Sequence, residues 1–117
     1  MGVRPVVVVL IGVFVLGGSA SATAPQAPTF TKDVAPILYK NCSQCHRPNE
    51  VAPMPLITYD QVRPWARSIK SKVLKKEMPP WGVGRTTLEF SNDRRMSDKE
   101  ISTLVAWVDA GARKGND

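Results

Sequence analysis

Five consecutive residues, Cys42-Ser43-Gln44-Cys45-His46, hold the only two cysteines and the only histidine of the 117-residue chain. This arrangement is the C-x-x-C-H pattern by which a c-type haem is attached. In that chemistry both thiols form thioethers with the porphyrin vinyl groups, and the imidazole ligates the iron. The motif constrains the fold because all three side chains have to face one side of a short helical turn.

Other cysteine chemistries fit the chain less well. A C-x-x-C disulfide closes a very small loop and would stabilise a fold little. A thioredoxin-like redox pair calls for a βαβ context, of which the sequence gives no sign. Structural zinc usually takes four protein ligands, and two cysteines with one histidine fall short of that number. The pattern therefore favours one covalent haem c, with its iron, as the cofactor, and a haem-free thiol-disulfide protein is the alternative.

Residues 1–24 are typical of a secretory signal peptide. Arg4 precedes an uncharged apolar run that ends at Leu16, and the small residues that follow offer cleavage sites after Ala22 or Ala24. A membrane-spanning helix needs about 20 apolar residues, which is longer than this run. We therefore expect a periplasmic or extracytoplasmic protein. Attachment to a membrane is expected only if the leader stays uncleaved.

Cleavage of that leader leaves one small domain of about 93 residues, which is 117 minus 24. The proline- and alanine-rich segment 25–29 predicts a linker, 30–112 the folded domain and 113–117 a C-terminal tail. A domain of this size buries a limited core, to which a large covalent cofactor would add apolar contacts.

Helical spacing of apolar residues predicts three main helices and no strand, so the expected fold class is all-α. The first helix runs from its expected N-cap, Asp33, to about Cys42. Its buried face comprises Val34, Ile37 and Leu38. This helix would lead the chain directly into the cysteine-histidine motif.

The second and third helices each open with a capping box. Thr58 and Gln61 form the first box, and Pro64 is expected to kink or split the helix that follows it. Its apolar stripe consists of Val62, Trp65, Ala66, Ile69 and Val73. Ser97 and Glu100 form the second box. The last helix carries Ile101, Leu104, Val105 and Val108, with Trp107 alongside, and ends near Gly111.

The loop after the motif, residues 47–56, is rich in proline. It is expected to wrap the haem edge beside His46. A ligating histidine usually donates its second ring N–H to a neighbouring acceptor. We expect a backbone carbonyl of this loop, that of Pro53 or Pro55, to accept the Nδ1–H.

A sixth iron ligand has to be something other than a second histidine, and methionine is a common choice in electron-transfer haem sites. Met54 follows His46 too closely to cross to the opposite haem face, and Met96 is placed to pack beside the cap of the last helix. Met78 directly precedes two prolines, which stiffen the segment that would present its sulfur. The sequence therefore predicts Met78 as the distal ligand, with a role as a core gap-filler as the alternative.

The distribution of charged residues indicates what kind of partner the protein could bind. The chain has sixteen Lys and Arg residues and ten Asp and Glu residues, and only Arg4 lies in the leader. The net charge of the mature chain is therefore near +5. Six cations cover the second helix: Arg63, Arg67, Lys70, Lys72, Lys75 and Lys76. The pattern favours an ordinary solvent-exposed helix face. The alternative, which is the more specific functional hypothesis, is that this face docks an acidic partner. No nucleic-acid partner is expected.

The order of these elements resembles a small class I cytochrome c, from Phe30 to about Ala112. The segments that carry the resemblance are 42–46, Met78-Pro79-Pro80 and the last helix with its 97–101 cap and 104–108 face. The resemblance implies a cytochrome c-like fold in which the first and last helices cross, with Val34 and Leu38 facing Leu104 and Val108. Two departures are the short proline-rich loop after the motif and Trp107, where the family often has tyrosine.

The chain also resembles haem domains that occur fused to copper-dependent monooxygenase-like modules. Two segments carry this resemblance: Val51-Ala52-Pro53-Met54 and Met78-Pro79-Pro80-Trp81. The function implied is electron transfer by a haem iron that cycles between Fe(II) and Fe(III), without enzymatic activity, between redox protein partners with acidic surfaces. The alternative is a five-coordinate haem that senses a small ligand or reacts with peroxide. That function would need an open distal face with a polar group.

Overall fold

The structure is a computed structural model that describes residues 1–2, 25–80 and 90–116. Residues 3–24 of the predicted signal peptide, which include both predicted cleavage sites, lie outside these ranges. Trp81 and residue 117 of the predicted tail also lie outside them. Within them the chain is helical and contains no strand, which confirms the all-α class. The elements are η1 (Phe30–Val34), α1 (Ala35–Asn41), α2 (Tyr59–Val62), η2 (Arg63–Trp65), α3 (Ala66–Leu74) and α4 (Asp98–Asp109). None of these described helices is long and apolar enough to cross a membrane.

The first helix begins three residues before the predicted N-cap. Thr29 has an extended backbone and precedes the wide π-helical turn η1, in which the N–H of Val34 donates to the Thr29 carbonyl at 3.2 Å. Asp33 lies inside this turn, where its carboxylate accepts the N–H of Thr29 at 2.8 Å. The N-cap prediction for Asp33 is therefore wrong, because Asp33 satisfies the exposed N–H from within the helix instead of preceding it. The helix ends at Asn41, with Cys42 as its C-cap.

The second helix is split as predicted. Thr58 and Gln61 form both hydrogen bonds of the capping box at the start of α2. The 3-10 turn η2, which contains Pro64, then separates α2 from α3. The prediction that Trp65 belongs to the buried stripe is wrong, since its side chain is 42% exposed. A 3-10 turn advances each residue further around the axis than an α-helix does, which takes Trp65 off the buried face.

The last helix begins and ends as predicted. Ser97 and Glu100 form a complete capping box at the start of α4. At its end Gly111 has φ of +93°, and the next N–H, of Ala112, donates to the Trp107 carbonyl at 2.8 Å. This pattern is a Schellman closure, which needs a left-handed residue at the position that Gly111 occupies.

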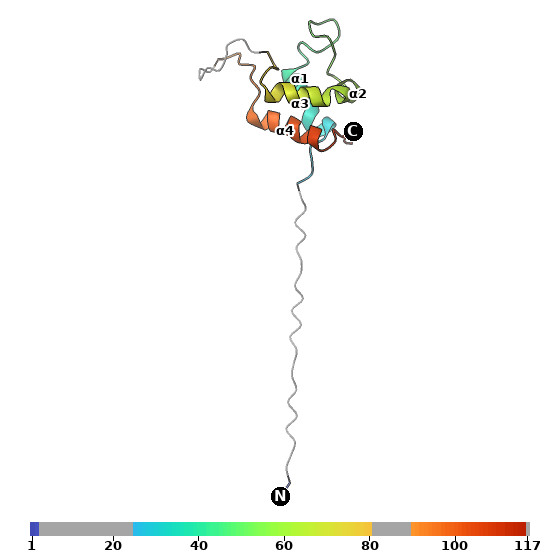
Figure 1. The fold of residues 1–117 in the computed structure, drawn as a ribbon, viewed down its shortest axis with the longest axis vertical. Helices are drawn as coiled ribbons and strands as arrows, with labels where there is room; N and C mark the ends of the chain where they lie inside the picture. Colours follow the sequence, from blue (N-terminus) through green and yellow to red (C-terminus); the bar gives the residue numbers. More distant parts are fainter. Residues whose placement is uncertain (3–24, 81–89, 117) are drawn as a thin grey trace.

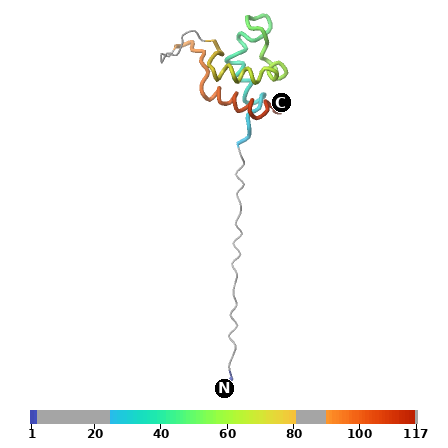
Figure 2. The backbone as a smooth tube through the Cα atoms, in the orientation of Figure 1, coloured from blue at the N-terminus to red at the C-terminus, as the bar shows by residue number. Residues whose placement is uncertain are grey.

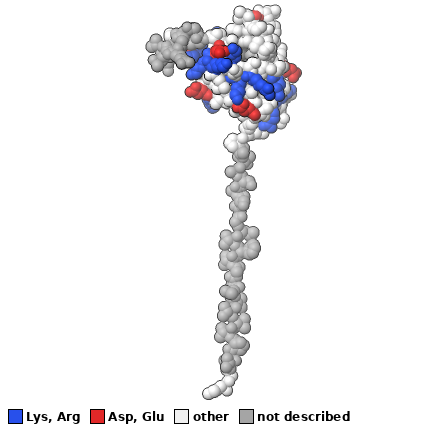
Figure 3. Space-filling view, viewed as in Figure 1, with Lys and Arg blue, Asp and Glu red and all other residues white. Residues whose placement is uncertain are grey.

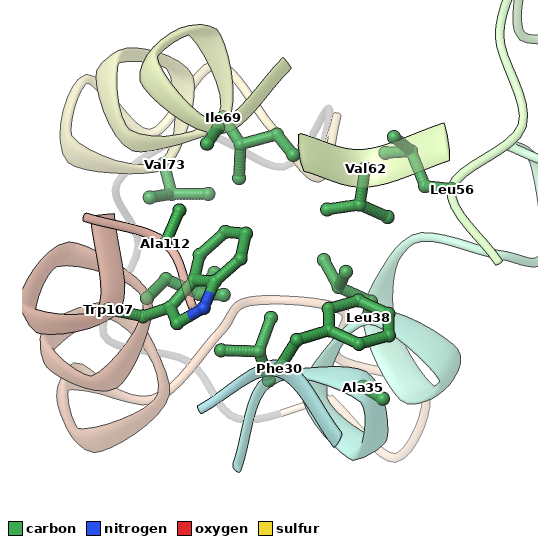
Figure 4. Close-up of a cluster of buried hydrophobic side chains, with 12 residues drawn as sticks. Phe30, Ala35, Leu38, Leu56, Val62, Ile69, Val73, Trp107 and Ala112 are labelled. Atoms are coloured by element: carbon green, nitrogen blue, oxygen red, sulfur yellow. The ribbon is translucent and has the colours of Figure 1, made fainter. Parts of the chain in front are cut away.

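The core lies where η1 and α1 run across the paired helices α3 and α4 (Figure 1). Val34, Leu38 and Leu104 are fully buried, and Val108 packs at the edge of the same cluster, so the residues expected to face one another share one core. Trp107 is also fully buried, next to Phe30 (Figure 4). The loop that follows α1 projects beyond these packed helices (Figure 2).

The start of the tail is bonded to the fold. The carbonyl of Arg113 accepts hydrogen bonds from the Phe30 N–H at 3.0 Å and from the Trp107 indole N–H at 2.9 Å. The Lys114 carbonyl accepts the Thr31 N–H at 2.9 Å. These bonds join the two ends of the domain, so residues 113 and 114 contribute to its packing.

Candidate functional site

The cysteine-histidine motif forms a tight turn at the end of α1. The N–H of Cys42 donates to the Leu38 carbonyl at 2.8 Å, which continues the helical pattern by one residue. The Cys42 carbonyl then accepts two N–H groups, that of Cys45 at 3.1 Å and that of His46 at 2.9 Å. One carbonyl thus fixes the backbone of the two other predicted site residues, and the turn brings Cys42, Cys45 and His46 together.

The proline-rich loop returns to this turn and closes on it. The Ala52 N–H donates to the Cys45 carbonyl at 3.2 Å, and the Leu56 N–H donates to the His46 carbonyl at 2.9 Å. Leu56 is buried in the core. The loop is therefore anchored to the motif at its middle and at its C-terminal end.

The imidazole of His46 is oriented by the same loop. Its Nδ1 lies 3.0 Å from the carbonyl oxygen of Met54. Because a carbonyl only accepts, Nδ1 carries the hydrogen and Nε2 keeps its lone pair. The prediction that a backbone carbonyl of this loop faces Nδ1 is confirmed, but the acceptor lies one position from each of the two residues suggested, Pro53 and Pro55. Because the Leu56 N–H is bonded to the His46 carbonyl, the Met54 carbonyl, two residues before Leu56, lies opposite the imidazole.

The two thiols are free and half-buried. Burial, together with the nearby carboxylate of Glu100, raises the pKa of the Cys42 thiol to about 11. Cys42 is therefore held as a neutral thiol at physiological pH. Within the described ranges, no three His, Cys, Asp or Glu side chains gather into a group that could hold a metal ion. A porphyrin, however, supplies four nitrogen ligands of its own, so that one imidazole and two thiols suit a haem.

Met78 lies apart from this turn, just beyond the end of α3. Lys76, with φ of +57°, closes the helix, and the Glu77 N–H donates to the Lys72 carbonyl at 3.0 Å. The Met78 side chain is 40% exposed, whereas Met54 and Met96 pack against the core. Of the three methionines in residues 25–80 and 90–116, Met78 is therefore the one that does not pack against the core. The Met78 N–H donates to the Lys72 carbonyl at 3.4 Å, and no hydrogen bond among the described residues links Met78 to the 42–46 turn.

Glu100 joins the end of α1 to the start of α4, a link that the sequence reasoning missed. Its Oε1 accepts from Lys40 Nζ at 2.8 Å and from Asn41 Nδ2 at 3.3 Å, while its Oε2 accepts the Ser97 N–H at 2.8 Å. Partial burial acts to raise the pKa of Glu100, but these hydrogen bonds outweigh it and lower the pKa from 4.5 to about 2. The predicted capping box covers the bond between Glu100 and Ser97 but not the bonds from Lys40 and Asn41.

Five of the six cations on the second helix fall into two groups, and the sixth, Lys75, interacts with the nearby Glu77 carboxylate. Lys70 pairs with Asp109, and Lys72 pairs with Glu77. Arg63, Arg67 and Lys76 are exposed and form no ion pair with any acid in the described part of the chain. Figure 3 shows Lys and Arg side chains gathered over one face of the domain.

Comparison with known proteins gives no relative. The chain matches no protein-family model, no curated protein and no solved structure. The function therefore has to be argued from the geometry of the turn itself.

Proposed function

We propose that the protein is a small monohaem cytochrome c of the class I type, which carries single electrons in the periplasm or another extracytoplasmic space. The observation that carries this proposal is the turn on which one carbonyl, that of Cys42, fixes both Cys45 and His46. Each free thiol would add its S–H bond across a porphyrin vinyl group, sulfur to one carbon and hydrogen to the other. The addition needs no oxidant, because the sulfur and the hydrogen of the thiol both end on the vinyl carbons.

His46 is the proposed proximal ligand of the iron. Its Nδ1–H is bonded to the Met54 carbonyl, which fixes the tautomer and leaves the Nε2 lone pair free. An imidazole held in this way is oriented before the iron arrives, so little rotational freedom is lost on binding.

Met78 is the proposed distal ligand. Its exposed thioether follows the closed end of α3 and precedes two prolines, which limit the conformations of the backbone that carries it. Haem c supplies one-electron chemistry when bound, since its iron accepts an electron as Fe(III) and releases it as Fe(II). The chain's task would then be to hold the His46 imidazole and the Met78 thioether in place and to exclude other ligands.

The proposed partners are redox proteins with acidic surfaces. Arg63, Arg67 and Lys76 have no acid to neutralise them within the described residues, so they are available to a partner. Attraction between such surfaces speeds the encounter of two proteins and is weakened by salt. An electron carrier benefits from this combination of fast association and weak binding.

Carbon monoxide binding tests the electron-carrier function against the five-coordinate alternative. The full chain is produced in an exporting host with haem-maturation machinery, and the reduced protein is mixed with carbon monoxide. We expect the wild type to bind slowly or not at all, the Met78→Ala variant to bind rapidly, and the control Met96→Ala to behave as the wild type. Rapid binding to the wild type would instead support a sensor or peroxide-reactive protein.

A further inference from the structure

Glu100 connects the last turn of α1 to the first turn of α4. One carboxylate oxygen accepts from Lys40 and Asn41, at the end of α1, and the other accepts from Ser97, at the start of α4. Asn41 directly precedes Cys42, so the link reaches the residue next to the first cysteine of the motif. Asn41 also donates to the Ile37 carbonyl at 2.9 Å, which ties this end of the helix to its own preceding turn.

We propose that Glu100 is the positioning residue of the haem-attachment turn: it holds the end of α1 before Cys42 against α4, and its negative charge lowers the reduction potential of the iron. This inference rests on the proposed function, since it assumes that a haem is attached at Cys42 and Cys45.

The two halves of the ion pair are screened unequally. The Glu100 side chain is 16% exposed, whereas that of Lys40 is 70% exposed. Water weakens the field of an exposed charge more than that of a shielded one, so the carboxylate dominates the field on the side of the turn. Because hydrogen bonds keep the pKa of Glu100 near 2, this carboxylate is ionised at neutral pH. A lasting negative charge favours the oxidised iron, which carries one more positive charge.

The same chain offers a nearly isosteric replacement for Glu100. Gln61 performs the equivalent capping role at the start of α2, where its side chain accepts the Thr58 N–H at 3.1 Å. A Glu100→Gln variant can therefore keep the cap of α4 while it loses the charge. Lys40→Gln removes the opposite charge and leaves the cap untouched. Ser97→Ala is the matched control, because it removes the hydroxyl of the cap and leaves both charges.

The test measures reduction potentials of the three haem-loaded variants and the wild type at neutral pH and low salt. We expect the potential to rise in Glu100→Gln, to fall in Lys40→Gln and to stay unchanged in Ser97→Ala. A role confined to stability would shift the first two variants in the same direction or not at all, and that result would overturn the proposal. If Glu100→Gln does not fold, the reduction potential of Lys40→Gln tests the proposal. A fall supports it, and an unchanged or higher potential overturns it.

Amide hydrogen exchange of the same haem-loaded proteins tests the positioning part. The Cys42 N–H, bonded to the Leu38 carbonyl, is expected to exchange about tenfold faster in Glu100→Gln than in the wild type, since a hydrogen bond to a charged acceptor is lost. Unchanged exchange there would contradict positioning by Glu100. A wild type without covalent haem would overturn the proposed function as well, whereas a haem-loaded wild type with unresponsive variants would overturn this inference alone.

Discussion

Acid should weaken the fold through Glu100. Its pKa falls from 4.5 to about 2 on folding, a difference of about 2.5 units. At about 1.36 kcal/mol per unit, the upper limit of its contribution is about 3.4 kcal/mol. The main donor, Lys40, is 70% exposed, so screening by water should reduce this to about 1–2 kcal/mol. Because the pKa is lowered in the folded state, the contribution is complete above pH 4.5 and is lost as the pH falls towards 2.

The measurement compares the unfolding free energy of the wild type and Glu100→Gln by urea denaturation at pH 7 and at pH 3. The wild type should be more stable at pH 7, and more than half of that advantage should disappear at pH 3. Glu50→Gln is the control, since Glu50 pairs with Arg47 in an ion pair whose partners are both exposed. An advantage that is the same at both pH values would refute the assignment of a lowered pKa to Glu100.

Three further substitutions test the caps and the core by denaturant unfolding. Lys76→Gly should stabilise the protein by about 0.5–1 kcal/mol, because Lys76 holds a left-handed conformation at φ of +57° that glycine adopts freely; a loss of stability would contradict this. Thr58→Ala should cost about 1 kcal/mol, since it removes the N-cap of α2, and an unchanged midpoint would show that the cap is not used. Leu104→Ala should cost about 2–5 kcal/mol, because the side chain is fully buried, and a cost below 1 kcal/mol would contradict the packing described.

The features that could be predicted from the sequence depend on residues close together in the chain. Both capping boxes join residues three positions apart, Gly111 acts through its own φ, and Pro64 breaks a helix by its missing N–H. Helical periodicity likewise identified most of the core, since a buried face repeats every three or four residues. The motif at 42–46 brings its own backbone groups together because it spans a single turn.

The features that could not be predicted depend on contacts between distant segments or on local helix type. Glu100 bonds to Lys40 and Asn41 across about sixty positions, and nothing in the local pattern indicates such partners. The Met54 carbonyl faces His46 because the loop folds back and Leu56 bonds to the His46 carbonyl, a closure that no local sequence pattern specifies. Trp65 falls on the buried stripe only if the spacing is α-helical, and the 3-10 turn does not follow that spacing.

Covalent attachment of haem is the central claim, and the intact mass of the full-length gene product purified from an exporting host with haem-maturation machinery tests it most directly. We predict the mass of the processed chain plus one haem, which persists under denaturing conditions because the thioether bonds are covalent. A variant with both Cys42→Ser and Cys45→Ser should show the mass of the bare chain. A wild-type protein that also has the bare mass, or that loses its haem on denaturation, would contradict the account.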